Sequence, residues 1–302
     1  MSTHVLQLMR KGCTMLQNVR LLKWCRYYGI FAGWNLLHGF PGETTEDYRR
    51  QLDVLKRITH LQPPEVGTRV QLDRFAPYYT EQSRFPIDEI RPLAGYRYIY
   101  PSGVDLDKIA NFFDCRMNDT VPEESHRETL EWVDIWRRRW SSERPDSLIY
   151  WRTPEALFIE AKRGETRRKY IIDGPTALTY EYCSETMRTV AQVRRHLQFH
   201  ARHDEFDDSE ISELLEDLCC KGLMLSEAGR YLSLAVPKSP SWFSANYGVD
   251  IPAAVAGRPR FVMAKGGSAW SPNKSRRRRA VSRSKYSRSG WLRRTSTRAS
   301  ER

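Results

Sequence analysis

The sequence lacks any run of about 20 consecutive apolar residues, the length that a membrane-spanning helix requires, and its start lacks the apolar core of a signal peptide. None of its six cysteines forms a Cys-x-x-Cys pair, so neither a structural zinc site nor a disulfide framework is predicted. We therefore expect a cytoplasmic protein that does not cross a membrane and whose thiols are mostly buried.

The sequence has no net positive charge outside one end of the chain. Residues 258–302 hold 15 Lys and Arg against the single acid Glu301, a net charge of +14, so the remaining 257 residues carry −2 of the total of +12. This serine- and arginine-rich run has too few apolar residues to offset the entropy of ordering it, so residues 237–302 are predicted to be a disordered basic tail. Loose, salt-sensitive binding of RNA or DNA is the alternative for the tail. The nearly neutral remainder argues against specific nucleic-acid binding.

Helix and strand patterns alternate over residues 1–102. Two helices precede residues 30–37, whose apolar run is typical of a parallel strand buried on both faces. A turn at residues 39–43 and an amphipathic helix follow, and residues 70–75 are predicted to be a second parallel strand. Two parallel strands can neither close a barrel nor cover their own edges, so we expect an α/β segment that belongs to a larger unit.

Residues 103–147 are predicted to be a helical connector. Trp132, Trp136 and Trp140 recur at intervals of four, which places them on one helix face. Ordinary packing is the favoured interpretation of this ridge over a ligand platform.

A second domain is predicted over residues 148–236. Two short strands joined by a turn at Arg163 and Gly164 come first, three helices follow, and a hairpin ends the pattern. This order predicts a winged helix-turn-helix. His196, His200 and His203 on its helices are interpreted as a polar face in preference to a metal site, because no further strong ligand is evident.

The motifs Gly39-Phe40-Pro41-Gly42-Glu43 and Arg74-Phe75-Ala76-Pro77-Tyr78-Tyr79 resemble parts of the second half of the radical S-adenosylmethionine (SAM) barrel. The longer run to about Val236 looks like radical SAM enzymes that mature ribosomally made peptides such as bacteriocins. Many relatives also carry an N-terminal cobalamin-binding domain. The resemblance therefore implies a fold of class α/β, a partial radical SAM (βα) barrel followed by the connector and the winged helix.

Three cysteines spaced Cys-x3-Cys-x2-Cys hold the iron–sulfur cluster of that family, and this sequence has no such triplet. The resemblance thus implies a C-terminal fragment from a truncated or split gene, inactive alone. If the missing half is supplied in trans, the expected partner is a separate N-terminal polypeptide that carries the cluster, and cobalamin where the enzyme uses it; a precursor peptide is the other expected partner.

The resemblance also assigns candidate cofactor-binding residues, without any catalytic residue. Glu43 either accepts a hydrogen bond from SAM or stabilises the start of the next helix, and Arg74 pairs either with a ligand carboxylate or with a surface acid. The SAM-binding candidates are Asn35, Gly39, Phe40, Pro41, Gly42, Glu43 and Arg74.

The winged helix is similar to leader-recognition domains that bind a precursor peptide as an added strand. A non-catalytic winged helix that binds nucleic acid or a protein partner is the alternative function. The acidic third helix, residues 210–220, argues against DNA. The expected peptide-binding edge comprises Phe158, Ile159, Glu160, Lys169, Tyr170 and Ile171.

Overall fold

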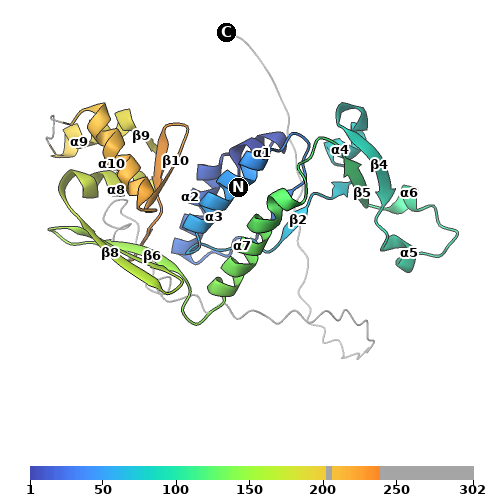
Figure 1. Ribbon diagram of the computed structural model, residues 1–302, viewed down its shortest axis with the longest axis horizontal. Helices are drawn as coiled ribbons and strands as arrows, with labels where there is room; N and C mark the ends of the chain where they lie inside the picture. Colours follow the sequence, from blue (N-terminus) through green and yellow to red (C-terminus); the bar gives the residue numbers. More distant parts are fainter. Residues whose placement is uncertain (202–205, 239–302) are drawn as a thin grey trace, which may run out of the picture. The chain divides into compact units, whose positions relative to one another are not determined.

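A computed structural model describes residues 1–201 and 206–238 of the chain (Figure 1). These residues form a mixed α/β structure with several small sheets, and they belong to one compact unit. No helix among them is long and apolar enough to cross a membrane. The basic tail predicted for residues 237–302 lies outside the described residues except for its first two, and of these Pro237 belongs to a strand.

A parallel strand–helix–strand unit lies in the N-terminal part of the chain. Helices α1 (Thr3–Leu8) and α2 (Met15–Tyr28) precede β1 (Leu36–His38), and α3 (Thr45–Arg57) connects β1 to β2 (Gly67–Arg69). Leu36 lies opposite Gly67 in the parallel ladder. The predicted unit is thus present, with strands that differ from the expected ones.

The strands are shorter because side chains replace ladder hydrogen bonds. The side-chain amide of Gln62 accepts a hydrogen bond from the Ala32 N–H and donates one to the Ala32 carbonyl. The Trp34 indole N–H donates to the backbone carbonyl of Gln62 at 3.1 Å. Residues 30–35 are consequently irregular, and only Leu36 and Leu37 of the expected strand pair, together with His38 beyond its expected end. The prediction of a parallel strand at residues 70–75 is wrong, since β3 (Leu72–Asp73) pairs antiparallel in another sheet.

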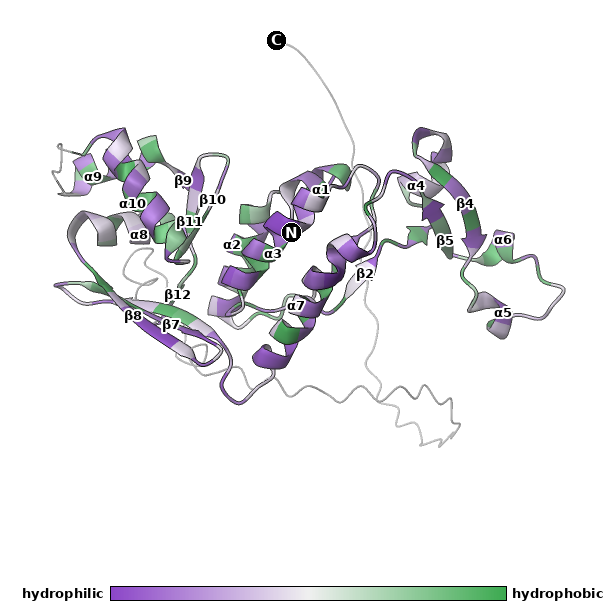
Figure 2. Ribbon diagram, viewed as in Figure 1, coloured by the Kyte–Doolittle hydropathy of each residue, from purple (hydrophilic) through white to green (hydrophobic). Residues whose placement is uncertain are grey.

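Local capping signals place the first long helices. Thr14 and Thr44 each form a reciprocal capping box, with Gln17 and Asp47 respectively. Gly29 ends α2 in the left-handed conformation at φ +69°, which glycine adopts without a steric penalty. Figure 2 shows hydrophilic and hydrophobic residues on separate parts of these helices, as expected of helices with one buried face.

A second small sheet crosses the predicted boundary between residues 102 and 103. Strand β5 (Phe112–Met117) is central and pairs antiparallel with both β3 and β4 (Ile87–Pro92). Its core is small, formed by Leu72, Ala110 and Phe113. The predicted helical connector is therefore partly strand. The short helices around this sheet are α4 (Pro77–Thr80), the 3-10 helix η1 (Gln82–Arg84), α5 (Tyr96–Ile99) and α6 (Leu106–Ile109).

Helix α7 (Glu124–Trp140) carries the tryptophan ridge, and its central member is a packing residue. Trp136 is fully buried, and its indole N–H donates to the carbonyls of Thr59 and Leu61 at 3.0 and 3.1 Å. Its ring also meets Trp34 edge to face at 6.1 Å. Trp132 and Trp140 instead lie against arginine side chains. This arrangement favours packing over a ligand platform.

The C-terminal part, residues 147–237, combines a four-stranded sheet, three helices and a three-stranded sheet. The sheets have the orders β12-β6-β7-β8 and β10-β11-β9. The elements are β6 (Ser147–Arg152), β7 (Leu157–Arg163), β8 (Thr166–Ile172), α8 (Gly174–Glu185), β9 (Arg188–Thr189), α9 (Val190–Ala201), α10 (Asp208–Cys220), β10 (Met224–Glu227), β11 (Arg230–Ser233) and β12 (Val236–Pro237).

Buried polar groups attach this part to the N-terminal helices. Lys23 of α2 is fully buried, and its ammonium group donates to the carbonyl and hydroxyl of Ser184 at 2.8 Å and to the Ser233 carbonyl at 2.7 Å. Desolvation lowers the pKa of Lys23 well below its usual value. His60, also buried, donates from Nε2 to the Leu234 carbonyl at 3.1 Å.

Replacing Lys23 should therefore be costly. We expect Lys23→Ala to lower the free energy of unfolding by about 3–5 kcal/mol, because it removes three buried hydrogen bonds and opens a cavity. The exposed Lys221, paired with Asp217, is the control, and Lys221→Ala should cost less than about 1 kcal/mol. Urea unfolding measures both; equal effects would contradict the role assigned to Lys23.

His60 should make stability fall in acid. Burial lowers its pKa from 6.5 to about 3, so below pH 6.5 the unfolded chain takes up a proton that the folded chain does not. Its contribution to stability is thus fully present above pH 6.5 and is lost as the pH falls towards 3. Unfolding free energies measured across this range should fall less steeply for His60→Gln than for the wild type, and an unchanged slope would refute this assignment.

Candidate functional site

The turn at residues 39–43 follows β1 directly and is closed by its own carboxylate. Glu43 is only 6% exposed, and its Oε2 accepts hydrogen bonds from the Gly39 N–H at 2.9 Å and from the Tyr48 hydroxyl. Burial raises the pKa of Glu43. Thr44 rather than Glu43 caps α3. In this structure Glu43 therefore holds the turn shut, a role that the sequence did not predict.

Two histidines lie beside this turn with unused ring nitrogens. The rings of His38 and His126 stack with centroids 4.1 Å apart, and Tyr48 lies 5.2 Å from His126. Burial lowers the pKa of His38 to about 4 and also lowers that of His126, so both are neutral at pH 7. Within the described residues, both Nδ1 atoms and Glu43 Oε1 are buried without hydrogen-bond partners. The turn thus has spare hydrogen-bonding capacity.

Side chains cover the glycine backbone that was expected to face a ligand. Gly39 and Gly42 have φ of +86° and +84°, which favour glycine. A Cβ on Gly39 would lie 3.0 Å from Arg69 Cγ, and one on Gly42 would lie 3.4 Å from a Leu8 methyl. Phe40 is buried, with its ring 6.3 Å from that of Tyr78. The turn is a packed corner in this structure.

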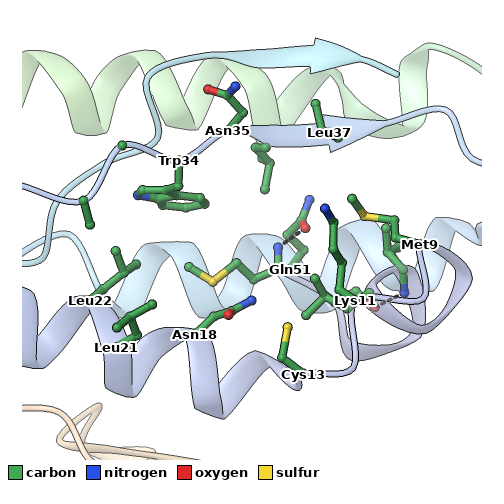
Figure 3. Close-up of a pocket in the computed structure, with 17 residues that line it drawn as sticks. Met9, Lys11, Cys13, Asn18, Leu21, Leu22, Trp34, Asn35, Leu37 and Gln51 are labelled. Carbon is green, nitrogen blue, oxygen red and sulfur yellow. Dashed lines mark hydrogen bonds between the residues drawn. The ribbon is translucent and has the colours of Figure 1, made fainter. Parts of the chain in front are cut away.

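A cavity of about 480 Å³ lies between α1, α2 and the edge of β1 that β2 does not cover (Figure 3). Of the seven SAM-binding candidates, Asn35 alone is among its lining residues. Figure 3 shows the Asn35 side chain on the side of the strand away from Gln51. No Asp or Glu lines the cavity to meet the positive charges of SAM. The expected SAM residues therefore do not gather around this cavity, and its lining does not fit SAM.

Arg74 is engaged by the backbone. Its guanidinium donates to the carbonyls of Ala110 at 2.6 Å and Asp107 at 2.5 Å, and to the Tyr79 hydroxyl at 3.2 Å. The ring of Phe113 lies 5.0 Å from the guanidinium carbon. Neither a ligand carboxylate nor a surface acid is its partner here, and sequence gave no signal for this arrangement.

Metal ligands do not cluster in the part of the chain that the structure describes. All six cysteines are free thiols, and no group of three or more His, Cys, Asp or Glu side chains could hold a metal ion. These residues do not fit an iron–sulfur cluster. His196 stacks on Tyr182 at 3.9 Å and adjoins His200, whereas His203 lies outside the described residues.

Strands β8 and β12 lie at the two edges of the four-stranded sheet, and among the described residues β8 pairs with β7 alone, so its other edge is open. The structure places Lys169, Tyr170 and Ile171 on this edge strand. Phe158, Ile159 and Glu160 instead lie on β7, which pairs with β6 on one side and β8 on the other. The expectation that residues 158–160 offer an edge is wrong, because both edges of β7 are occupied.

Comparison with known proteins gives no relative. No family model, no curated protein and no solved structure matches this chain.

The closed turn predicts a measurable coupling between Glu43 and Tyr48. In a double-mutant cycle of Glu43→Ala and Tyr48→Phe, we expect a coupling of about 1–3 kcal/mol in the free energy of unfolding. The exposed Glu46, which pairs with Arg49 and Arg50, is the control, and Glu46→Ala should cost less than about 1 kcal/mol. Strict additivity of the two changes would show that the hydrogen bond does not hold the turn.

Proposed function

We propose that this chain is part of a radical SAM enzyme that modifies a ribosomally made precursor peptide, and that residues 147–237 recognise that peptide. In this proposal residues 147–237 are a winged helix of the leader-binding type. The open edge of β8 is the observation that carries the proposal, because an extended peptide can add to such an edge through main-chain hydrogen bonds.

The N-terminal part supports a role inside a larger α/β unit. Strands β1 and β2 are parallel, joined by α3, and pair only with each other among the described residues. Parallel sheets are normally larger and covered on both faces. Further strands, in the same chain or in a partner, would complete a barrel beside the cavity of Figure 3.

In this proposal the described residues do not supply the cofactor chemistry. Since the cysteines of this chain do not fit a cluster, the iron–sulfur centre, and the cobalamin where the enzyme uses one, would be held by other residues of the complete enzyme. The role proposed for the described residues is to bind and position the peptide.

The competing function, a nucleic-acid-binding winged helix, is disfavoured by charge. Helix α10 would be the recognition helix, and the phosphates of DNA would meet its acidic side chains. Those acids are Asp208, Glu210, Glu213, Glu216 and Asp217.

Proline substitutions in β8 test the peptide-binding role. In the full chain, Lys169→Pro and Ile171→Pro should keep the fold, since an outward-facing N–H on an edge strand is dispensable, but should weaken leader binding at least tenfold. Arg168→Pro, at a position bonded to β7, should instead unfold the sheet. The probes are synthetic peptides that cover short reading frames beside the gene. Fluorescence anisotropy should find one with a Kd of about 1–10 µM, and no binding at about 1 mM would contradict the proposal.

Co-expression tests the enzymatic part. The same precursor, expressed with this gene and its flanking coding DNA, should change in mass, and the β8 variants Lys169→Pro and Ile171→Pro should reduce the change at least tenfold. An unmodified precursor in the presence of all components would contradict the enzymatic proposal.

A further inference from the structure

We propose that the β8 edge selects an acidic strand, in which two carboxylates two residues apart are followed, at the same spacing, by an apolar residue. This selectivity deepens the proposed function, since it rests on peptide addition to β8. It follows from the register of the β7–β8 hairpin and from the side chains that the register places at the edge.

The turn of this hairpin fixes which backbone groups are free. Arg163 lies opposite Thr166, and Gly164 between them has φ +57°, as in a two-residue hairpin turn with glycine at its first central position. The hydrogen-bonded pairs of an antiparallel ladder alternate from that point, so Arg168 and Tyr170 bond to β7. The N–H and C=O groups of the alternate residues 167, 169 and 171 are directed at the open edge.

The same three residues share one face of the sheet. Successive side chains of a strand alternate between faces, so Arg167, Lys169 and Ile171 point to one side and Arg168 to the other. Buried Leu157 and Ile159 belong to the face of Arg168, which is therefore the core side. The open edge thus presents two cations and one apolar side chain on the solvent side.

These cations are available to a partner. The Lys169 side chain is 80% exposed, and its ion pair with Glu160, at 3.2 Å, lies at the surface. Arg167 is exposed and has no ion-pair partner within the described residues. Opposite Arg167 lies Lys162, whose ammonium group is bonded to the Arg144 carbonyl. The excess of positive charge makes a carboxylate the complementary group.

An apolar row continues from Ile171 across the solvent face. Trp151, Phe158 and Ile171 are opposite one another on three neighbouring strands. The rings of Trp151 and Phe158 stack at 5.5 Å with an angle of 9° between their planes, and Ile171 is 67% exposed. An apolar side chain added next to Ile171 would extend this row and bury it.

The register then dictates the spacing in the peptide. A strand that bonds to residues 167, 169 and 171 places its own residues directly opposite them, with side chains on the same face. Carboxylates opposite Arg167 and Lys169 are therefore two residues apart, and the apolar residue opposite Ile171 comes two residues beyond.

A symmetrical probe tests this selectivity without assuming a strand direction. Capped Val-Thr-Glu-Thr-Glu-Thr-Val offers the pattern in both directions, whereas Val-Glu-Thr-Thr-Glu-Thr-Val has the same composition with its acids on opposite faces. Anisotropy with the full chain at 0.15 M salt should show at least fivefold tighter binding of the first. Arg167→Glu and Lys169→Glu should each weaken it at least fivefold, whereas Arg168→Glu, with the same change in net charge, should weaken it less than twofold.

The outcomes separate this inference from the proposed function. Equal binding of the two probes, or equal effects of the three charge reversals, would overturn the acidic-strand selectivity. Should a precursor peptide bind and respond to the β8 prolines while being indifferent to Arg167→Glu and Lys169→Glu, only the selectivity fails. If the symmetrical probe binds as described but no precursor peptide binds, the selectivity stands and the peptide-maturation function fails.

Discussion

The buried amino group of Lys23 is the constraint on which the arrangement of this chain depends. A nitrogen donor without water needs hydrogen-bond acceptors at short range, and Lys23 finds them at Ser184, at the end of α8, and at Ser233, in β11. Few placements of α2 against residues 147–237 satisfy all three bonds. Around this anchor a single hydrophobic core runs from Leu16 and Val19 of α2 to Tyr180 and Leu232. The sequence pattern changes near residue 148, but the N- and C-terminal parts share one hydrophobic core in this structure.

Signals that act within a few residues could be predicted from sequence. The sequence predicted the caps at Thr14 and Thr44, the end of α2 at Gly29, and the order of helices and hairpin after β8. Each of these features depends on residues close to it in sequence. The first expected strand was too long and the second was misplaced, because the extent of each depends on distant partners. Gln62 takes the hydrogen bonds of Ala32, and Phe113, 41 residues along the chain, pairs with Leu72.

At the candidate sites, too, local features could be predicted from sequence and long-range contacts could not. The motif at residues 39–43 correctly predicted a tight turn after a strand, but sequence could not show that Arg69 and Leu8 would cover its glycines or that Tyr48 would take the Glu43 carboxylate. The contacts that Arg74 makes in this structure could not be predicted, because most of them are to carbonyl oxygens, which every residue carries and no motif marks. In the four-stranded sheet, Gly164 indicated the β7–β8 hairpin, whereas the pairing of β6 with the other edge of β7 could not be predicted.

The anchor at Lys23 also bears on what a peptide at β8 could achieve. Ser184, which accepts from Lys23, donates its hydroxyl hydrogen to Tyr150 of β6 at 3.2 Å, and β6 pairs through β7 with β8. On the other side, α2 lines the cavity beside β1. A continuous set of hydrogen bonds and ladders thus joins the proposed peptide edge to the parallel strand unit. Because the network consists of buried hydrogen bonds and paired strands, its physical role is to fix distance and orientation. A peptide held at β8 would therefore have its onward path set relative to β1, which is what a recognition element must provide when the chemistry takes place elsewhere.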